Sequence, residues 1–302
     1  MALRAVGVAG GLMLLMACAG TGGATRKAPV VTQGEEGRPV VIARSYTLES
    51  SVLKETRRIN VYVPPSYADG KTRLPVLYLL DGGEQEDFHH IAGLAQLASL
   101  NHAMREMMVV GIEGIDRKRD FTFPSSDPVD QKELPTSGGS AAFREFLGRE
   151  LKPWVEARFR TTGESALIGE SLAGLFTLET FLRQPELFDR YIAVSPSLWW
   201  DNQSLAKESA TRLRAHPSGP RALYLSVGDE GGGMQEGMDT LVGALKAQTP
   251  AGLQWHYEPL PNEHHHTVYH PAAFRAMRVL FPVPPKEASG SGSGSGSTSG
   301  AP

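Results

Sequence analysis

Short apolar runs recur through the middle of the chain, and segments with a helical pattern lie between them. Runs that are apolar on both faces are typical of buried parallel strands, and here they occupy residues 76–80, 108–112, 166–169, 191–194 and 223–227. Residues 57–63 alternate polar and apolar side chains, as a half-buried strand does. Residues 254–258 are the expected last strand. The pattern therefore predicts a sheet whose central strands are buried.

The segments between these runs predict helices. One of them places apolar residues along a single stripe, which consists of Phe143, Phe146, Leu147, Leu151, Trp154 and Val155. Further helices are expected over residues 172–184 and 241–248, and a last helix is expected to contain Phe274, Met277, Arg278 and Phe281. This alternation predicts an α/β fold with a mainly parallel central sheet and helices on both faces. In such sheets ligands bind beyond the carboxyl ends of the strands.

The first residues have the pattern of an export signal. Arg4 precedes an apolar stretch of signal-peptide length, and the tetrapeptide LMAC that ends at Cys18 resembles a bacterial lipobox. We therefore expect residues 1–17 to be a lipoprotein signal peptide and Cys18 to be lipidated. The protein would be exported to the cell envelope, at the periplasmic face or the outer membrane, and held to a membrane by its lipid anchor only. The alternatives are an ordinary signal peptide with a chance cysteine, or a buried cysteine.

Both ends of the chain differ in composition from its centre. Residues 18–45 show no periodicity, and we expect them to hold the lipidated cysteine and a flexible tether. Residues 284–302 are so rich in Gly and Ser that they are expected to be disordered. Residues 46–283 remain as one domain.

Charge and cysteine content exclude several classes of protein. The 302 residues carry a formal net charge of −3, which argues against a nucleic-acid partner. The single cysteine excludes an intramolecular disulfide and a cysteine-cluster metal site. No apolar run reaches the roughly 20 residues of a membrane-spanning helix.

A serine follows the predicted strand at 166–169, within the segment Gly169-Glu170-Ser171-Leu172-Ala173-Gly174. This segment is close to G-x-S-x-G, in which small neighbours allow a sharp turn that exposes a nucleophilic serine before a helix. The N-terminus of that helix presents unpaired N–H groups to an oxyanion. The alternative is a tight turn with a helix-capping serine.

Candidates for a base and an acid follow the last two predicted strands. In hydrolases of this type the histidine comes last in the chain, and here His264, His265 and His266 follow strand 254–258. Asp229 and Glu230 follow strand 223–227, and either carboxylate can orient a histidine. The alternatives are a solvated loop with incidental histidines, and carboxylates that only cap a helix. Consecutive histidines converge poorly on a metal, so neither a metal nor another cofactor is expected.

An oxyanion hole needs two N–H donors. One is expected from Leu172, the residue after the candidate nucleophile. The other is expected from Gly82 or Gly83, because a glycine after an early central strand allows the backbone to approach a substrate closely. The alternative for these glycines is a plain turn.

Six ordered segments together resemble one family. They are similar to its motifs LLDG at 79–82, GI…R-x-R-D at 111–120, F…EL-P at 143–159, G-H-S-x-G-G-L-F at 169–176, SPS-x-WW at 195–201 and E-x-H-x-S-V at 263–268. The family is the putative esterase family of the α/β-hydrolase superfamily. It includes trilactone-siderophore hydrolases and relatives of S-formylglutathione hydrolase and feruloyl esterases. The resemblance spans nearly all of residues 46–283 and implies the α/β-hydrolase fold.

The resemblance also implies roles for single residues. It identifies Ser171 as the nucleophile and His265, the middle histidine, as the base, and Glu230 is the preferred acid. Glu170 stands where a histidine is common and Ala173 where glycine is usual. Neither departure removes a catalytic group.

The expected activity is serine-dependent hydrolysis of a small-molecule carboxylic ester, with siderophore-like or aromatic esters as candidate substrates. Arg117, Arg119, Trp199 and Trp200 are expected to line the substrate pocket, where aromatic and cationic groups suit an anionic aromatic ester. The alternative is that the tryptophans pack the loop and the arginines pair with neighbouring aspartates. Two other functions use the same fold: acyl transfer by the same triad, and ligand capture by a catalytically silent lipoprotein.

Overall fold

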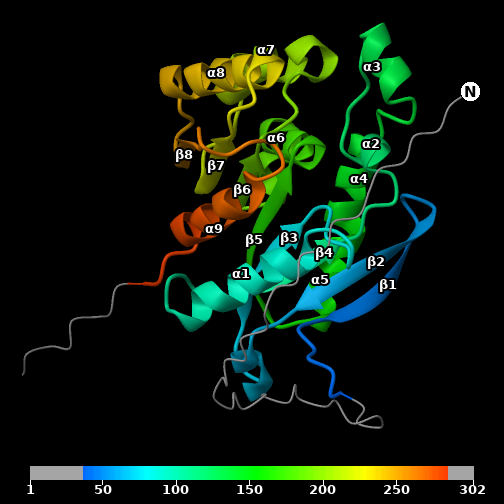
Figure 1. Ribbon diagram of the computed structural model, residues 1–302, viewed down its shortest axis with the longest axis vertical. Coiled ribbons are helices and arrows are strands. Elements are labelled where there is room, and N and C mark those ends of the chain that lie inside the picture. Colours follow the sequence, from blue (N-terminus) through cyan, green and yellow to red (C-terminus); the bar gives the residue numbers. More distant parts are fainter. Residues whose placement is uncertain (1–36, 285–302) are drawn as a thin grey trace, which may run out of the picture. The chain divides into compact units, whose positions relative to one another are not determined.

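The structure is a computed structural model that describes residues 37–284. From Val41 to residue 284 the chain forms one compact unit around an eight-stranded sheet, with strand order β1-β2-β4-β3-β5-β6-β7-β8 (Figure 1). The six strands from β4 to β8 in this order are parallel, and β1 and β2 are antiparallel at one edge. The predicted α/β fold with a mainly parallel sheet is confirmed. The strands are β1 (Arg44–Ser50), β2 (Glu55–Tyr62), β3 (Leu74–Leu79), β4 (Met108–Ile112), β5 (Thr161–Glu170), β6 (Arg190–Val194), β7 (Arg221–Val227) and β8 (Leu253–Pro259).

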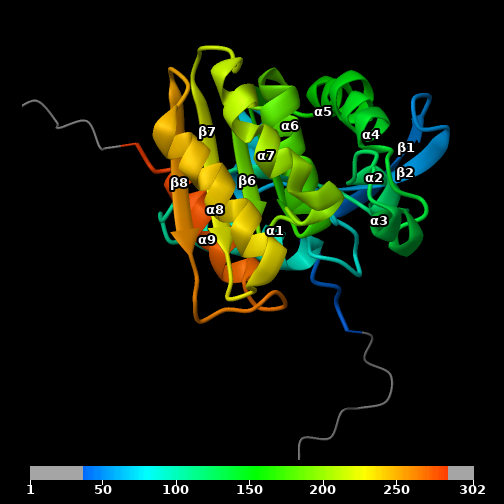
Figure 2. The same cartoon turned by 90° about the horizontal axis from the view of Figure 1, so that it is seen from above.

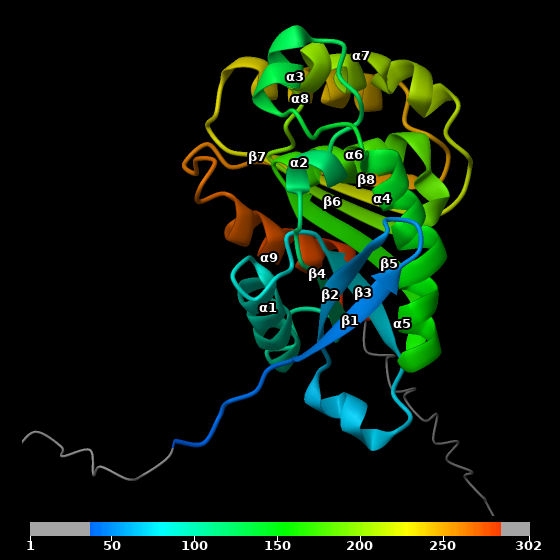
Figure 3. The same cartoon turned by 90° about the vertical axis from the view of Figure 1, so that its right-hand side faces the viewer.

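Helices cover both faces of the sheet (Figure 3). One face carries α1 and α9, which pack against each other; on the other face α6 packs on β5 and β6, and α7 lies beside α8 (Figure 2). A π-helical turn, Leu147–Leu151, joins α4 to α5. The helices are α1 (Phe88–Leu100), α2 (Arg117–Asp120), α3 (Pro128–Glu133), α4 (Ser140–Phe146), α5 (Lys152–Arg158), α6 (Leu172–Arg183), α7 (Trp200–Arg214), α8 (Gly232–Ala247) and α9 (Tyr269–Leu280).

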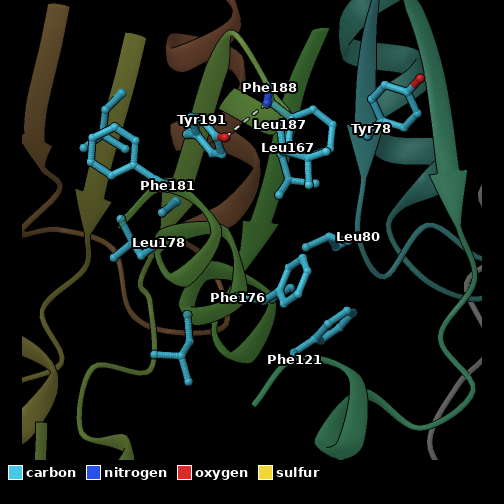
Figure 4. Packing of buried hydrophobic residues seen from close by; sticks show 14 of the residues in the cluster. Tyr78, Leu80, Phe121, Leu167, Phe176, Leu178, Phe181, Leu187, Phe188 and Tyr191 are labelled. Carbon is cyan, nitrogen blue, oxygen red and sulfur yellow. Dashed lines mark hydrogen bonds between the residues drawn. The ribbon is translucent and has the colours of Figure 1, made fainter. Parts of the chain in front are cut away.

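Alternate residues of each central strand enter different cores. Tyr78 and Leu167 pack in the cluster that contains Phe176 and Phe181 of α6 (Figure 4), whereas Leu77 packs with α1 and α9 on the other face. Burial of each large apolar side chain contributes about 1.5–3 kcal/mol. These two cores hold the parallel strands in place, and the strand ends in turn position the loops that carry the candidate chemistry.

The structure contains elements that the pattern does not reveal. β1 begins at Arg44, just before the expected start of the domain, and most of its side chains are exposed or half-buried. The buried face of α1 consists largely of alanines, which give a weak apolar stripe. The predicted signal peptide at 1–17, Cys18 and residues 285–302 of the predicted tail lie outside the described residues. Between residues 37 and 284, no helix combines the length and apolar character needed to cross a membrane.

Candidate active site

Ser171 occupies the turn between β5 and α6, at the carboxyl end of a central strand. Its backbone adopts φ 60° and ψ −120°, a conformation that residues other than glycine rarely adopt. Strain of this kind persists where surrounding contacts impose it. Here the Ser171 N–H donates to the carbonyl oxygen of Val194 (3.1 Å), and the Ser171 carbonyl accepts from the Ser197 N–H (3.0 Å). The turn has the form of a nucleophile elbow.

Small neighbours make this turn sterically possible. A Cβ atom at Gly169 would lie 2.5 Å from the Ala173 carbonyl oxygen and 2.7 Å from the Ala173 methyl group, so only glycine fits there. Conversely, the buried methyl group of Ala173 finds room because Gly169 has no side chain. The alanine in the usual place of a glycine is therefore compatible with the elbow.

Three side chains from separate loops meet beside this turn. His265, in the loop between β8 and α9, places its Nε2 3.1 Å from Ser171 Oγ and its Nδ1 2.9 Å from Glu230 Oε2. Glu230 lies in the loop between β7 and α8 and is nearly buried, with its side chain 5% exposed. An ionised carboxylate only accepts hydrogen bonds, so Nδ1 carries the proton and Nε2 is free to accept from Ser171. Asp229 is exposed and forms its hydrogen bonds at this site through its backbone, to Glu263 and His264.

The pKa shifts of this pair favour a charged state. Burial alone would raise the pKa of Glu230, but hydrogen bonds from His265 and Ser195 hold it below its ordinary value. The hydrogen bond to Glu230 raises the pKa of His265 against the effect of burial, and the nearby Glu170 adds to the rise. Both shifts stabilise an imidazolium opposite a carboxylate, which is the state that forms when His265 accepts a proton.

Glu170 is a second carboxylate close to His265, on its other side. Its Oε1 lies 3.9 Å from His265 Nε2, the nitrogen that faces Ser171. Burial raises the pKa of Glu170 to about 7, although His265 and Arg117 oppose the rise. Glu170 and His265 therefore influence each other's titration, and their protons belong to the pair.

The candidate oxyanion donors differ in their hydrogen bonding. Leu172 is the first residue of α6, where helix N–H groups have no intrahelical partner. The Gly83 N–H, in contrast, donates to Glu86 Oε2 at 2.6 Å. The Leu172 N–H is thus available to a substrate oxygen, and the Gly83 N–H becomes available only when the Glu86 carboxylate moves away.

Gly82 does not fit the role of a donor. Its N–H donates to the carbonyl oxygen of Ile112 (2.8 Å), which extends the pairing between the ends of β3 and β4. A Cβ atom at this position would lie 2.4 Å from the Gly111 Cα. This glycine therefore permits close packing of two backbones, and its expected role in the oxyanion hole is corrected.

A cavity of about 580 Å³ opens beside Ser171. The apolar residues of its lining are Leu134, Leu172, Trp199 and Met234, and of these Leu134 and Met234 were not expected at the site. The polar and charged residues of the lining include Arg117, Lys118, Ser197, Asp229, His264 and His266. The cavity therefore offers an apolar wall and cationic groups next to the nucleophile candidate.

The two adjacent tryptophans have different environments. Trp199 lines the cavity and is 37% exposed. Trp200 is fully buried, and its Nε1 donates to the carbonyl oxygen of Phe123 at 2.9 Å. The expectation that Trp200 contacts the substrate is corrected, because its ring packs in the core.

The two candidate arginines, Arg117 and Arg119, also lie in different environments. Arg117 lines the cavity and forms a two-point ion pair with Asp81, through Nε at 3.2 Å and Nη2 at 2.9 Å. Arg119 instead pairs with Asp120 and Glu55, at 2.7 and 2.8 Å. The expectation that Arg119 contacts the substrate is corrected, because ion pairs away from the cavity hold its side chain.

Two serines that the sequence reasoning did not select also contact the site. Ser195 Oγ donates to Glu230 Oε1, and Ser197 Oγ lies 3.4 Å from Ser171 Oγ. Both serines follow β6, so the signal available in the sequence is a pair of hydroxyls directly after a buried parallel strand. Within residues 37–284, no three His, Cys, Asp or Glu side chains gather to hold a metal ion.

Several known proteins that resemble this chain are named as esterases or hydrolases. It is 27% identical to the ferri-bacillibactin esterase BesA of Bacillus subtilis, over 59% of this chain and 67% of the relative. It is 28% identical to the siderophore triacetylfusarinine C esterase of Aspergillus fumigatus, over 65% and 71% respectively. An IroE-like serine hydrolase from Shewanella oneidensis superposes with a TM-score of 0.71 and 30% identity, covering 79% of this chain and 80% of that one.

The match to a family profile covers most of the chain. The profile described as “Putative esterase” matches residues 50–276, which contain Ser171, Glu230 and His265. The protein therefore belongs to this esterase family and is a carboxylic ester hydrolase.

Proposed function

We propose that the protein hydrolyses its ester through an acyl-enzyme formed on Ser171. The observation that carries this proposal is the continuous hydrogen-bonded series from Ser171 Oγ through His265 to Glu230, with distances of 3.1 and 2.9 Å. A nucleophile, a base within hydrogen-bond reach and a group that orients the base are the parts that covalent catalysis by serine requires.

In the first half of the reaction, Ser171 Oγ attacks the ester carbonyl while its proton passes to His265 Nε2. The ionised Glu230 stabilises the resulting imidazolium and holds the ring in the required tautomer. The tetrahedral intermediate then expels the alcohol, which takes the proton from Nε2, and the acyl group remains on Ser171. Water repeats these steps on the acyl-enzyme, and release of the carboxylic acid restores the Ser171 hydroxyl.

The oxyanion is stabilised by the Leu172 N–H at the start of α6. Gly83 supplies the second donor once Glu86 leaves its N–H, a rearrangement consistent with donors that align only when substrate binds. Loss of a single donor of this kind costs roughly 3–4 kcal/mol in a comparable hydrolase.

The substrate class follows from the cavity and from the relatives. Leu134, Trp199 and Met234 suit an apolar or aromatic group of the ester, and Arg117 and Lys118 suit an anionic one. One relative is named a siderophore triacetylfusarinine C esterase and another a ferri-bacillibactin esterase. We therefore place siderophore-like and aromatic carboxylic esters first among the candidate substrates.

Export and lipidation are part of the proposal. The LMAC tetrapeptide and the apolar stretch before it support cleavage ahead of Cys18 and attachment of a lipid to its thiol. Incorporation of an alkyne-tagged fatty acid tests this step: the wild type should be labelled and Cys18→Ala should not. Equal labelling of both proteins would contradict lipidation at Cys18.

A fluorophosphonate probe tests the catalytic proposal. Intact-mass measurement should show one adduct on the wild type and none on Ser171→Ala, which should also lose about 10⁵-fold or more in kcat. Circular dichroism and thermal melting should show that the variant remains folded. A well-folded wild type that forms no adduct would overturn the mechanism.

A further inference from the structure

We propose that the turn Ser195-Pro196-Ser197, here called the serine clamp, holds both ends of the catalytic triad, with Ser195 orienting the acid and Ser197 supporting the nucleophile. This inference rests on the proposed function of Ser171. Its topological basis is the position of β6, which lies between β5 and β7 in the sheet (Figure 1). The turn after β6 therefore lies between the loop that carries Ser171 and the loop that carries Glu230.

The backbone in and directly before the serine clamp forms hydrogen bonds with the strained turn at Ser171. The N–H of Ser171 donates to the carbonyl of Val194, directly before the clamp, and the N–H of Ser197 donates to the carbonyl of Ser171. The Ser171 carbonyl also accepts from the Leu175 N–H of α6 (2.9 Å), so the segment from Val194 to Ser197 pairs the Ser171 N–H and adds a second donor to the Ser171 carbonyl. Gly174 allows this approach, because a Cβ atom there would lie 2.8 Å from the Val194 carbonyl oxygen.

Ser195 acts on the acid of the triad. Its side chain is fully buried, and its hydroxyl donates to Glu230 Oε1, while Oε2 of the same carboxylate accepts from His265. The carboxylate is therefore held at both oxygens, which sets its plane relative to the imidazole. Ser195 has a positive φ of 40°, a strained conformation in a residue other than glycine. A purely structural turn at this place is better served by glycine, whereas the hydroxyl needs a serine.

Ser197 acts on the nucleophile. Its side chain is 2% exposed and its Oγ lies 3.4 Å from Ser171 Oγ. When Ser171 donates its own proton to His265 Nε2, the Ser197 hydroxyl is left as the donor between the two serines. This donor stabilises negative charge that develops on Ser171 Oγ as the proton leaves, so it lowers the barrier to attack without binding the substrate more tightly.

A Ser197→Ala variant tests the contact with the nucleophile, because it removes the hydroxyl and keeps the backbone N–H. We expect kcat and the rate constant for fluorophosphonate labelling to fall about tenfold or more, with KM within about twofold of wild type. Ser209→Ala is the matched control, since Ser209 is a buried serine whose hydroxyl bonds within α7. It should lose comparable thermal stability and keep wild-type kinetics.

A pair of variants, Ser195→Ala and Ser195→Gly, tests the contact with the acid. Both lose the hydroxyl, but glycine adopts the positive φ without strain and should melt at a higher temperature than alanine. The charged groups that face His265 are Glu230, Glu170 and Arg117. Without the Ser195 hydrogen bond Glu230 becomes more basic and holds the imidazolium more strongly. The acid limb of the kcat/KM profile should therefore move to higher pH in both variants, although their stabilities differ.

The outcomes separate the serine clamp from the proposed function. If the wild type forms no fluorophosphonate adduct, the proposed function fails and the clamp fails with it. If the wild type is labelled and Ser197→Ala is labelled equally fast, Ser197 does not support the nucleophile. A wild-type pH profile in Ser195→Gly likewise overturns the role of Ser195, because that variant lacks the hydroxyl without the strain.

Discussion

Two regions meet at Ser171, the catalytic triad candidates and the apolar wall of the cavity. Different kinds of contact hold each region in place. The triad candidates follow the carboxyl ends of parallel strands, and main-chain hydrogen bonds such as Ser171 N–H to Val194 hold the turns there. The apolar wall of the cavity, defined by Leu134, Trp199 and Met234, comes from α3, α7 and α8 and the loops beside them. Its parts are joined mainly through side chains.

The contacts behind Trp199 illustrate the second means. Trp200 Nε1 donates to the Phe123 carbonyl, and the Asp201 carboxylate accepts from the backbone N–H of Ser126 at 2.7 Å. The Asp201 N–H in turn donates to Asp130 at 2.7 Å. Main-chain pairing keeps the course of a backbone when side chains change, whereas a region joined by side chains moves when one of them changes. The wall is therefore the part of the site that we expect to determine which ester fits.

Among the predictions that compare the two regions, the largest effect is expected in the triad, the region held by main-chain hydrogen bonds. In Glu230→Gln the amide can donate to Nδ1 of His265 and so favour the wrong tautomer. A comparable change in a serine protease lowers kcat about 10⁴-fold, and we expect a loss of about that size here. Steady-state kinetics on a chromogenic ester, with folding checked by circular dichroism, measure it.

Asp229→Asn is the matched control for that prediction. The Asp229 side chain is exposed in the same loop, and its hydrogen bonds at the site come from its backbone. Its kcat should stay within about twofold to threefold of wild type, in line with a surface substitution. Equal losses in the two variants would show that charge in the loop matters and that the Glu230 hydrogen bond does not.

A second prediction compares Trp199, in the apolar wall of the cavity, with Trp200, which is buried behind it. Trp200→Ala should lower the free energy of unfolding by about 3–5 kcal/mol. The substitution leaves a cavity at a fully buried position and removes the hydrogen-bond donor of the Phe123 carbonyl. Trp199→Ala should change it by about 1 kcal/mol or less and should raise KM for an aromatic ester. Chemical denaturation gives the first quantity and kinetics the second. Similar stability losses in both variants would contradict the separate roles of the two rings.

The same division explains what the sequence could predict. Central strands are buried on both faces, so their apolar runs reveal them, and residues shortly after them, such as Ser171 and the pair Asp229 and Glu230, become candidates by position. Arg117 and Arg119 lie on one short helix, and only tertiary packing decides that Arg117 faces the cavity and Arg119 faces Glu55. Neither periodicity nor spacing contains that information.

The tandem carboxylates and the glycines after β3 show the same limit. Asp229 and Glu230 are equivalent in position, and the difference arises from the loop backbone that turns Glu230 toward His265. Gly82 and Gly83 both satisfy the requirement for a flexible residue after an early strand. Only the neighbouring backbone of β4 shows that Gly82 is needed for packing.

The smallest expected effect concerns Glu170, which lies where the two regions meet, close to His265 and within the electrostatic reach of Arg117. Neutral His265 is the form that accepts the Ser171 proton, so kcat/KM rises as pH passes the pKa of His265. The ionised Glu170 stabilises the imidazolium and raises that pKa. In Glu170→Gln the charge is absent, so the acid limb of the profile should move to lower pH, by roughly one unit or less.

The shape of that profile tests the coupling as well as the charge. In the wild type, Glu170 with a pKa of about 7 and His265 share their protons, so the acid limb should be broader than a single titration. In Glu170→Gln the acid limb should narrow to the shape expected for the titration of His265 alone. Asp229→Asn removes a negative charge from the same cavity without removing a neighbour of Nε2, and it should leave the limb in place. An equal shift in both variants would mean that His265 responds to the net charge of the cavity, and that the 3.9 Å approach of Glu170 to Nε2 has no separate effect.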